Sequence, residues 1–429
     1  MCVLRGTNPI RIRPTRSGGA TFVAASAYRR AEQVSADFAR RIAGYVVLAH
    51  DPAVPVAAAD YWTHSAPFYR AVVEQIEDTV ANDLAYRRLV ANPTDTNAER
   101  HFQARLTDLL ARDPSLVEMM RRRVDAADDN VYINYFHGES YQPAAAPTDV
   151  DRLTEIAGGR RARPTGTGDE ILVVIPVSDR DGTGRIRNLM ACLLALRDQS
   201  FPAERYRVTV VEFDERPRWR GIIEPQVDHY LHVKGHGLFN KSWTLNVGAR
   251  RTPGRARTLC LLDADILVDR HFLERNHARF ADPDHDAHLP HTEMLSLDQP
   301  SSDLMIEERC GAGAGQASLG YARGLLLRDV PGACLWTRPE IFHRIGGFDE
   351  RYRGWGGEDE DMLYRITAAG SVTQYDDVFL HLAHRRPAMR RADGEPFNGH
   401  VPPGTWTGEL GYGDPSRPAQ VGAAEAIGE

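Results

Sequence analysis

Paired cysteines and long apolar runs are both missing from this chain of 429 residues. No apolar run reaches the length that crosses a bilayer, and the sequence after Met1 turns polar before a signal-peptide core forms. We therefore expect a cytoplasmic protein without a membrane span. The cysteines lack the spacing of a zinc site or a redox motif, so we expect reduced thiols, mostly in the core; the five are Cys2, Cys192, Cys260, Cys310 and Cys334.

An excess of basic residues is missing as well. The chain holds 52 lysines and arginines against 59 aspartates and glutamates, a formal net charge of -7. Proteins that bind nucleic acid usually concentrate positive charge on one face, so we expect no nucleic-acid partner. With 42% hydrophobic and 26% charged residues, the composition is that of a globular protein large enough for two domains.

The pattern of apolar residues divides the chain into three regions. Residues 1–165 indicate a mainly α-helical accessory domain and linker, and residues 166–395 alternate short apolar runs with helical stretches. Residues 396–429 indicate an irregular tail. In the first region we expect amphipathic helices near 20–48, 66–90 and 99–125 and a linker rich in turn residues at 142–169.

The central region predicts an α/β fold. Alternation of buried runs and helices is typical of a Rossmann-like, mostly parallel sheet with helices on both faces. Such folds bind ligands beyond the carboxyl ends of their strands. Residues that follow the strands are therefore the first candidates for a site. We expect these strands at 171–177, 207–213, 230–233 and 258–262.

Capping signals locate three further helices in the central region. Ser242 is placed to cap a helix over 243–250. A second helix begins at Pro339, because proline is favoured in the first turn, and is stopped by two glycines. A third covers 358–369 and ends at a glycine.

Asp263 and Asp265 directly follow the strand expected at 258–262. Where a strand runs into a turn, both carboxylates can point into the crevice beyond the sheet edge. Carboxylate oxygens suit Mg²⁺ or Mn²⁺ together with phosphate oxygens. An Asp-x-Asp triplet also occurs as a helix cap or in an ordinary loop, so the motif alone leaves both interpretations open.

His381 and His384 follow the apolar run 378–380. Residues three apart on a straight strand face opposite sides, so both can bind one ion only if the chain turns between them. Imidazole nitrogens beside carboxylates would favour Mn²⁺ over Mg²⁺. The alternative is one core histidine and one surface histidine.

Residues 346–361 place four acidic residues behind a tryptophan flanked by glycines. The indole of Trp355 can stack on a pyranose while Gly356 and Gly357 let the backbone fold over it, and a nearby carboxylate can take a proton from a hydroxyl nucleophile. Acidic residues at a helix start also complement the helix dipole, which explains the charges by itself. It does not explain an indole on a glycine-rich turn, so we expect Trp355 to contact a ligand.

Two further segments carry residues suited to a nucleotide diphosphate. Phe239 and Lys241 place an aromatic ring and a cation at a helix start. Glu212 and Asp214, at the end of a predicted strand, could accept hydrogen bonds from a nucleobase. Charged residues at strand ends are common in any sheet, so this second interpretation has an ordinary alternative.

From about residue 170 to 390 the chain resembles the metal-dependent, inverting GT-A glycosyltransferases, and within them the β-1,4-galactosyltransferases and the related family 2 enzymes. Ser178 and Asp179 stand where vertebrate members have an Arg-Asn pair, and residues 1–165 match nothing in that family. Four motifs carry the resemblance in the family's order: residues 175–180 its first-strand nucleotide loop, 239–241 with 245–248 its next element, 263–265 its DxD motif, and 354–359 its acceptor and catalytic loop.

The resemblance implies a role for each matching residue. Asp265, His384 and His381 would bind Mn²⁺ (or Mg²⁺), with His381 standing where vertebrate members have a methionine. Asp359 would be the catalytic base, and Glu358 would hold the acceptor or donor sugar. The nucleotide sugar would contact Pro176, Arg180, Glu212, Asp214, Phe239, Lys241 and Asp263, and the sugar or acceptor would contact Trp355, Gly356 and Gly357.

The function that this resemblance implies is an inverting glycosyltransferase. A sugar would move from a nucleotide-diphosphate sugar, with a UDP-sugar favoured, to a small-molecule, glycan or peptide acceptor, under a lid formed by the Trp355 turn and the tail. One alternative is a carbohydrate- or nucleotide-binding protein that kept the fold and lost turnover. Another is a metal-dependent nucleotide hydrolase or nucleotidyltransferase that uses Asp263 and Asp265. The helical region is open to acceptor recognition or to contacts within a homo-oligomer.

Overall fold

The computed structural model describes residues 27–159, 169–180, 182, 184–408 and 411–416, and of residues 27–35 and Asp60 the backbone alone. Within these limits the chain forms two compact units. Of the described residues, unit 1 takes in those from 139 to 322 and from 330 onward, and unit 2 takes in those from 27 to 138 together with 323–329. Along the chain, the first of these boundaries lies between residues 138 and 139, ahead of the linker expected at 142–169, and residues 150–158 of that expected linker are helical.

Unit 2 is mainly helical. The helix expected over 66–90 is two helices, because the Asp83 carboxylate accepts hydrogen bonds from the Ala85 and Tyr86 amides and starts a new one. The helix expected over 99–125 is likewise divided, at Asp113, by a side-chain cap followed by a proline. Residues 20–26 of the first expected helix lie outside the described residues. The helices are α1 (Ala27–His50), α2 (Ala53–Ala57), α3 (Ala59–Val80), α4 (Leu84–Ala91), α5 (Thr96–Arg112) and α6 (Pro114–Asn130), and β1 (Ile133–His137) pairs antiparallel with β8 (Arg323–Arg328).

Unit 1 is built on a seven-stranded sheet, as the α/β prediction requires. Its strand order is β10-β6-β9-β5-β2-β3-β4, and all neighbours are parallel except for β9, which runs antiparallel to both β5 and β6. Outside the seven-stranded sheet, β7 (Glu293–Leu297) pairs in parallel with β11 (Leu380–His381). The seven strands are β2 (Ile171–Val177), β3 (Tyr206–Asp214), β4 (His229–Lys234), β5 (Thr258–Leu262), β6 (Ala287–Leu289), β9 (Cys334–Thr337) and β10 (Val372–Gln374).

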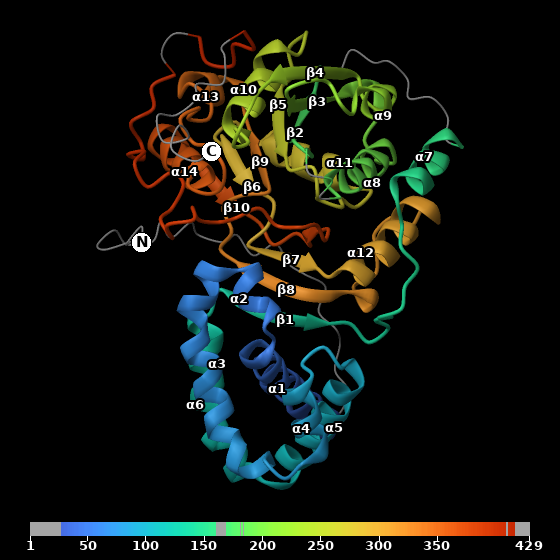
Figure 1. Cartoon of the computed structure of the whole chain (residues 1–429), viewed down its shortest axis with the longest axis vertical. Coiled ribbons are helices and arrows are strands. Elements are labelled where there is room, and N and C mark those ends of the chain that lie inside the picture. The colour runs from blue at the N-terminus through green and yellow to red at the C-terminus, as the bar shows by residue number, and fades with distance from the viewer. Residues whose placement is uncertain (1–26, 160–168, 181, 183, 409–410, 417–429) are drawn as a thin grey trace. The chain divides into compact units, whose positions relative to one another are not determined.

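Helices cover both faces of this sheet. Figure 1 shows α10, α13 and α14 on one side and α8 and α11 on the other. The cap of α10 is Asn240, whose side chain accepts from the Trp243 amide, and not Ser242 as expected. The helices of unit 1 are α7 (Val150–Gly158), α8 (Arg185–Arg197), α9 (Arg220–Ile223), α10 (Lys241–Arg251), α11 (Phe272–Ala278), α12 (Gln299–Ile306), which continues into a π-helical turn (Glu307–Gly311), α13 (Pro339–Arg344) and α14 (Glu358–Ala369).

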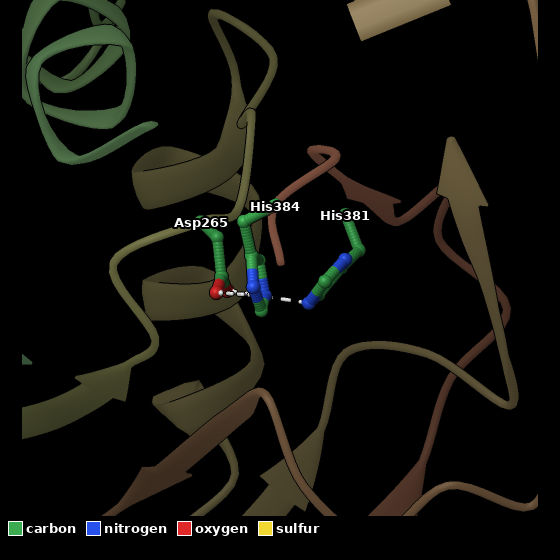
Figure 2. A group of neighbouring side chains, drawn as sticks. All are labelled: Asp265, His381 and His384. Carbon is green, nitrogen blue, oxygen red and sulfur yellow. Dashed lines mark ion pairs between the residues drawn. The ribbon is translucent and has the colours of Figure 1, made fainter. Parts of the chain in front are cut away.

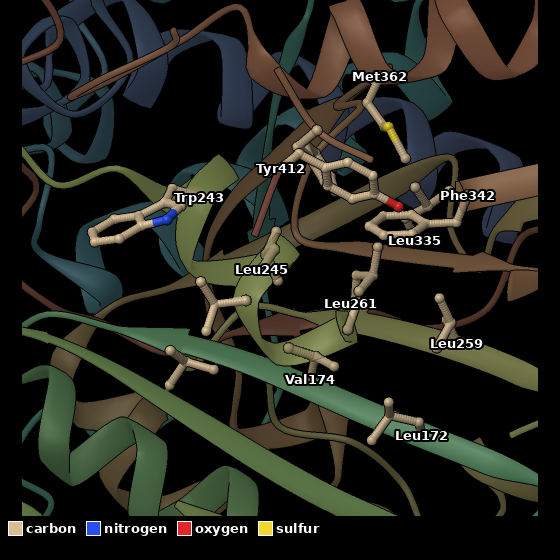
Figure 3. Packing of buried hydrophobic residues seen from close by; sticks show 14 of the residues in the cluster. Leu172, Val174, Trp243, Leu245, Leu259, Leu261, Leu335, Phe342, Met362 and Tyr412 are labelled. Atoms are coloured by element: carbon tan, nitrogen blue, oxygen red, sulfur yellow. The ribbon is translucent and has the colours of Figure 1, made fainter. Parts of the chain in front are cut away.

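The core between the sheet and α10 holds the strand ends in place (Figure 3). Leu172 and Val174 on β2 and Leu261 on β5 face the same side, as residues two apart on a strand do, and pack with side chains from α10, α13 and α14. Burial of one such side chain stabilises the fold by roughly 1.5–3 kcal/mol. Tyr412 belongs to this cluster and Trp406 packs against it, so these two residues of the region predicted as an irregular tail contribute to the core. Among the described residues, no helix is both long and apolar enough to cross a membrane.

Candidate active site

The Asp-x-Asp motif lies at the carboxyl end of the central strand β5, where the α/β topology predicts a ligand site. β5 ends at Leu262, and the Asp263 amide donates to the Ala333 carbonyl at 2.9 Å, one position beyond the last residue pair of β5 and β9. Asp265 is 5% exposed. Ala333 has a φ of 73°, an uncommon backbone conformation for a residue with a side chain. The strained position therefore lies directly beside the motif.

Asp265, His381 and His384 meet at one point, as Figure 2 shows. One ligand atom from each residue lies within 4.8 Å of the others. His384 Nε2 is 3.0 Å from Asp265 Oδ2, and His381 Nε2 is 3.5 Å from Asp265 Oδ1. The chain turns after β11, so the two histidines face the same carboxylate. The alternative of one core and one surface histidine does not describe this arrangement.

The hydrogen bonds of this group fit a divalent cation. His384 Nδ1 is 2.8 Å from the Arg385 carbonyl, which can only accept, so Nδ1 carries the proton and Nε2 faces the carboxylate. That geometry calls for a positive charge between Nε2 and Asp265, either a second proton or a metal ion. Asp265 Oδ1 is buried without a hydrogen-bond partner among the described residues. One carboxylate and two imidazoles are a donor set suited to Mn²⁺.

The ionisation of these residues also suits metal binding. Burial raises the pKa of Asp265, but His381 and His384 outweigh burial and hold it well below its usual range. Burial lowers the pKa of His381 to about 4, so this ring is neutral at neutral pH. Metal ligands must be ionised carboxylates and neutral imidazoles. The residues present therefore fit the metal ion that the resemblance implies.

Lys241 contacts both the Asp-x-Asp motif and the acidic residues 358–361 at the start of α14, which are called the acidic loop below. Its Nζ lies 3.1 Å from a carboxylate oxygen of Asp263 and 3.1 Å from one of Asp359, and 3.7 Å from Glu358. Burial lowers the pKa of Lys241, but the three carboxylates raise it by more, so the pKa lies well above its ordinary value. Lys241 is thus a fixed cation between Asp263, two residues from Asp265, and the predicted catalytic base.

Glu358 and Asp263 differ in their ionisation from ordinary carboxylates. Burial, helped by the charge of Asp359, raises the pKa of Glu358 to about 8. Burial also raises the pKa of Asp263 to about 6, against the opposing effect of Lys241. Glu358 therefore holds a proton at neutral pH and can donate a hydrogen bond. It does not compete with Asp359 as a proton acceptor.

We expect the replacement Glu358→Gln to make unfolding less sensitive to pH. Between pH 4.5 and 8 the folded protein keeps the Glu358 proton while the unfolded chain loses it, so the stability of the wild type falls by up to about 1.4 kcal/mol per pH unit from this group. Glutamine has no such proton. We expect the difference between the Tm of the variant and the Tm of the wild type, measured from pH 5 to 8.5, to increase as pH rises.

Glu340→Gln, on the exposed start of α13, is the matched control and should show a constant difference. A Tm difference for Glu358→Gln that does not change over this pH range would contradict the assigned ionisation of Glu358.

Because Gly332 has no side chain, the Asp359 carboxylate can occupy the space beside it. Both residues line a small pocket with Lys241 and Asp263. A Cβ at position 332 would fall far inside contact distance of Asp359 Oδ2. We expect Gly332→Ala to move this carboxylate and lower kcat about 100-fold, because misplacement of a reacting group by an ångström has effects of that order. Gly221→Ala, at a glycine with open space around it, should leave kcat unchanged; equal effects of the two substitutions would contradict this role.

The Trp355 turn is held by two distant segments. The Gly354 amide donates to the Phe239 carbonyl at 2.9 Å. Asn398 Nδ2 donates to the Gly356 carbonyl at 2.7 Å, and its Oδ1 accepts from the Arg353 amide at 2.9 Å. Gly356 and Gly357 have φ of 92° and 95°, which only glycine adopts readily. The turn that presents the half-buried Trp355 is thus tied to the carboxyl-terminal segment.

Not every acidic residue of the loop faces the site. Asp361 is 1% exposed, accepts from Arg365 Nε at 2.8 Å and from the Gly404 amide at 2.7 Å. Arg365 in turn donates to the Ile345 and Gly347 carbonyls. Asp361 therefore anchors α14 and the carboxyl-terminal segment, while Glu358 and Asp359 face Lys241.

The residues expected to contact the nucleobase have other partners in this structure. The Glu212 carboxylate accepts from the Trp219 amide at 3.1 Å and from the Tyr230 hydroxyl, and Asp214 accepts from Arg218 at 3.1 Å. The Arg180 guanidinium lies 4.9 Å from the centre of the Phe213 ring. Pro176 lies within β2, paired with Val211 of β3, and Phe239 packs edge-on against Phe213 at 5.5 Å. These residues gather around the end of β3, and their contacts with a nucleotide stay predictions.

Two residues of the site could not be predicted from the sequence pattern. Gly332 lies in a short loop before β9, and its role appears only in its closeness to Asp359. Asn398 lies in the region taken as an irregular tail, 42 residues from the glycine whose carbonyl it binds. The sequence likewise does not predict the positive φ of Ala333.

Comparisons with known proteins bear on this geometry. Residues 328–385 match the family described as the N-terminal domain of galactosyltransferase. This match contains the acidic loop and both histidines. A mannosyltransferase of Pyrobaculum calidifontis, solved with GDP-Man and Mn²⁺, covers 57% of this chain and 65% of its own at 16% identity and a TM-score of 0.34, a likeness too slight to bear on function.

Sequence relatives extend beyond that segment. Validoxylamine A glucosyltransferase of Streptomyces hygroscopicus subsp. limoneus is 26% identical over 224 residues, which are 46% of this chain and 48% of that protein. The pre-mycofactocin glycosyltransferase of Mycobacterium tuberculosis is 27% identical over 226 residues, 52% of this chain and 44% of that protein. β-1,4-Galactosyltransferase 3 of Homo sapiens is 25% identical over 144 residues, 33% of this chain and 29% of that protein. The chain spans about half the length, or less, of these relatives. Over these parts of its length the chain is similar to proteins that are named glycosyltransferases, in agreement with the glycosyltransferase motifs of the sequence.

Proposed function

We propose that the protein is an inverting glycosyltransferase that moves a sugar from a nucleotide-diphosphate sugar to an acceptor hydroxyl or other nucleophile. The observation that carries the proposal is the position of Lys241, which bonds both to Asp263 of the Asp-x-Asp motif and to Asp359 of the acidic loop. Because Asp263 is two residues from Asp265, this contact supports a single site that holds both the candidate metal ligands and the proposed proton acceptor.

The donor end of the site would be held by Asp265, His381 and His384 with a divalent cation, Mn²⁺ in preference to Mg²⁺. When bound, this ion offsets the negative charge that develops on the departing nucleoside diphosphate. Asp263 and Lys241 lie beside the donor, where Lys241 offers a cation to the diphosphate or the sugar. A UDP-sugar is favoured, on the resemblance of the motifs to the galactosyltransferases.

Asp359 would act at the acceptor end. It accepts the proton of the acceptor nucleophile while that atom forms a bond to the anomeric carbon and the bond to the diphosphate breaks. Attack from the face opposite the leaving group inverts the configuration. Protonated Glu358 donates a hydrogen bond to a hydroxyl of the bound sugar. Trp355 supplies an apolar face for the acceptor.

A lid is part of this proposal. The Trp355 turn is glycine-rich and tied through Asn398 to the segment that follows His384. Donor binding would order the turn and the segment together and exclude water from the sugar. Protease cleavage within residues 385–408 should slow in the presence of Mn²⁺ and donor. If the rate of cleavage does not change, the proposed lid is wrong.

The experiment that tests the function is a screen of nucleotide sugars for protection against thermal unfolding, with and without Mn²⁺. A ligand that binds the folded state raises stability by mass action, by about 2.7 kcal/mol at a hundred times its Kd. Donors of glucose and galactose come first, because the relatives are named a glucosyltransferase and a galactosyltransferase. We expect one donor to raise the Tm only with Mn²⁺. Phosphodiester cleavage without sugar transfer would favour a nucleotide hydrolase.

A further inference from the structure

The short segment from His381 to His384 carries two of the three candidate metal ligands. β11 ends at His381, and His384 reaches the same carboxylate only because the chain turns at residues 382 and 383. The Leu382 amide donates to the Asp265 carbonyl at 2.8 Å, which fixes one side of this turn. A turn of this kind exposes peptide groups that need partners in a buried place.

Side chains from α8 and α12 supply those partners. Arg187 Nη2 and Asn188 Nδ2 both donate to the Ala383 carbonyl at 3.1 Å. Ser302 Oγ accepts from the Ala383 amide at 2.8 Å. The peptide groups between the two histidines are therefore held from two directions.

Further hydrogen bonds and an ion pair hold the side chains of Arg187 and Asn188 in place. Arg187 Nε and Nη2 donate to Asn188 Oδ1 at 3.0 and 2.7 Å, and Arg187 Nη1 pairs with Asp303 Oδ1 at 2.8 Å. Asp303 also accepts from the Gln299 side chain and the Thr148 amide. Arg187 is 7% exposed, and Asn188, Ser302 and Asp303 are no more than 2% exposed.

Such a network is hard to explain by stability alone. Two charges lose most of their hydration when they are buried, and an apolar pair of similar volume is often as stable. Burial also lowers the pKa of Arg187, against the opposing effect of Asp303, so the charge is maintained at a cost. The bonds converge on one short segment, and that segment carries two of the three metal ligands.

We propose that Arg187 and Asn188 are positioning residues for the metal site: they hold the turn between His381 and His384 in the conformation that brings both imidazoles to Asp265. Ser302 fixes the same peptide from the other side. This inference rests on the metal site of the proposed function. Residues that orient metal ligands without touching the metal typically alter affinity about 10- to 100-fold when they are replaced.

The test is the affinity of the full chain for Mn²⁺ alone, measured by the loss of the electron paramagnetic resonance signal of free Mn²⁺. Arg187→Met and Asn188→Leu should weaken the Kd about 10- to 100-fold while circular dichroism shows a folded protein. Arg207→Met is the matched control. Arg207 is also 7% exposed and donates to a backbone carbonyl, that of Pro253, but it lies at the amino end of β3, away from the strand ends that form the site.

The outcomes separate this inference from the proposed function. If the wild type binds Mn²⁺ and the Arg187 and Asn188 variants bind it equally well, the positioning role is wrong and the metal site stands. If the wild type binds no Mn²⁺, and Asp265→Asn behaves as the wild type does, the metal site of the proposed function is wrong. Should Arg187→Met fail to fold, Asn188→Leu and Ser302→Ala decide, because Ser302→Ala deletes only the bond to the Ala383 amide; wild-type affinity in both would overturn the inference.

Discussion

Asp359→Asn is expected to lose sugar transfer by about 100- to 10,000-fold while the Kd for the donor changes little. Positioned general bases contribute rate factors of this size, and an amide of the same shape cannot accept the proton. Donor binding should survive because the proposed metal ligands are Asp265, His381 and His384, which do not include Asp359. Transfer rate and donor affinity should be measured on the same preparation.

Glu360→Gln is the matched control for this substitution. Glu360 is the next residue on α14 and is exposed, whereas the carboxylates that pair with Lys241 are those of Asp263, Glu358 and Asp359. We expect its transfer rate to stay within a few-fold of the wild type. A protein whose Asp359→Asn variant behaves like the wild type would be a binding module on a glycosyltransferase fold, and the catalytic assignment would be wrong.

The second large effect is expected at the metal site. Asp265→Asn should weaken Mn²⁺ binding by more than about 100-fold, beyond the range expected for residues that only orient the ligands, and should reduce transfer in parallel. The substitution keeps the shape of the side chain but removes the negative charge that lies 3.0 Å from His384 Nε2. Calorimetric titration with Mn²⁺ measures the affinity directly.

His236→Ala is the control for nonspecific loss of a histidine that pairs with a carboxylate. His236 lies 3.0 Å from Glu215, and both side chains are about 60% exposed, so this pair contributes little to stability. Its replacement should leave Mn²⁺ affinity unchanged. If Asp265→Asn binds Mn²⁺ as tightly as His236→Ala does, the cation binds elsewhere.

The centre of the sheet could be predicted from the sequence because β2, β3 and β5 are buried on both faces. The bounds 171–177 and 258–262 agree with β2 and β5, and 358–369 agrees with α14, whose acidic start and glycine end are local signals. Between residues 285 and 330 the sequence pattern predicts no element, whereas the structure has β6, β7 and α12 there. β6 has three residues, too few for a period to appear. Its place is set by pairing with β9 and β10, which no local pattern carries.

The candidate site could be predicted as a set of residues but not as an arrangement. The motifs name Asp263, Asp265, Asp359 and the two histidines. The contact of Lys241 with Asp359 joins residues 118 apart, and that of Asn188 with the Ala383 carbonyl joins residues 195 apart. Such contacts depend on how α8, α10 and α14 pack on the sheet. For the same reason the sequence left open whether His381 and His384 face one carboxylate.

The central claim is that one divalent cation binds between Asp265, His381 and His384. Anomalous diffraction at the manganese absorption edge, from crystals of the full chain grown with Mn²⁺ and a nucleoside diphosphate, tests it most directly. The account predicts a single strong peak at about 2.0–2.3 Å from the carboxylate oxygen and the imidazole nitrogens, the range of protein metal–ligand bonds. A manganese peak elsewhere, with these three side chains unliganded, would contradict it.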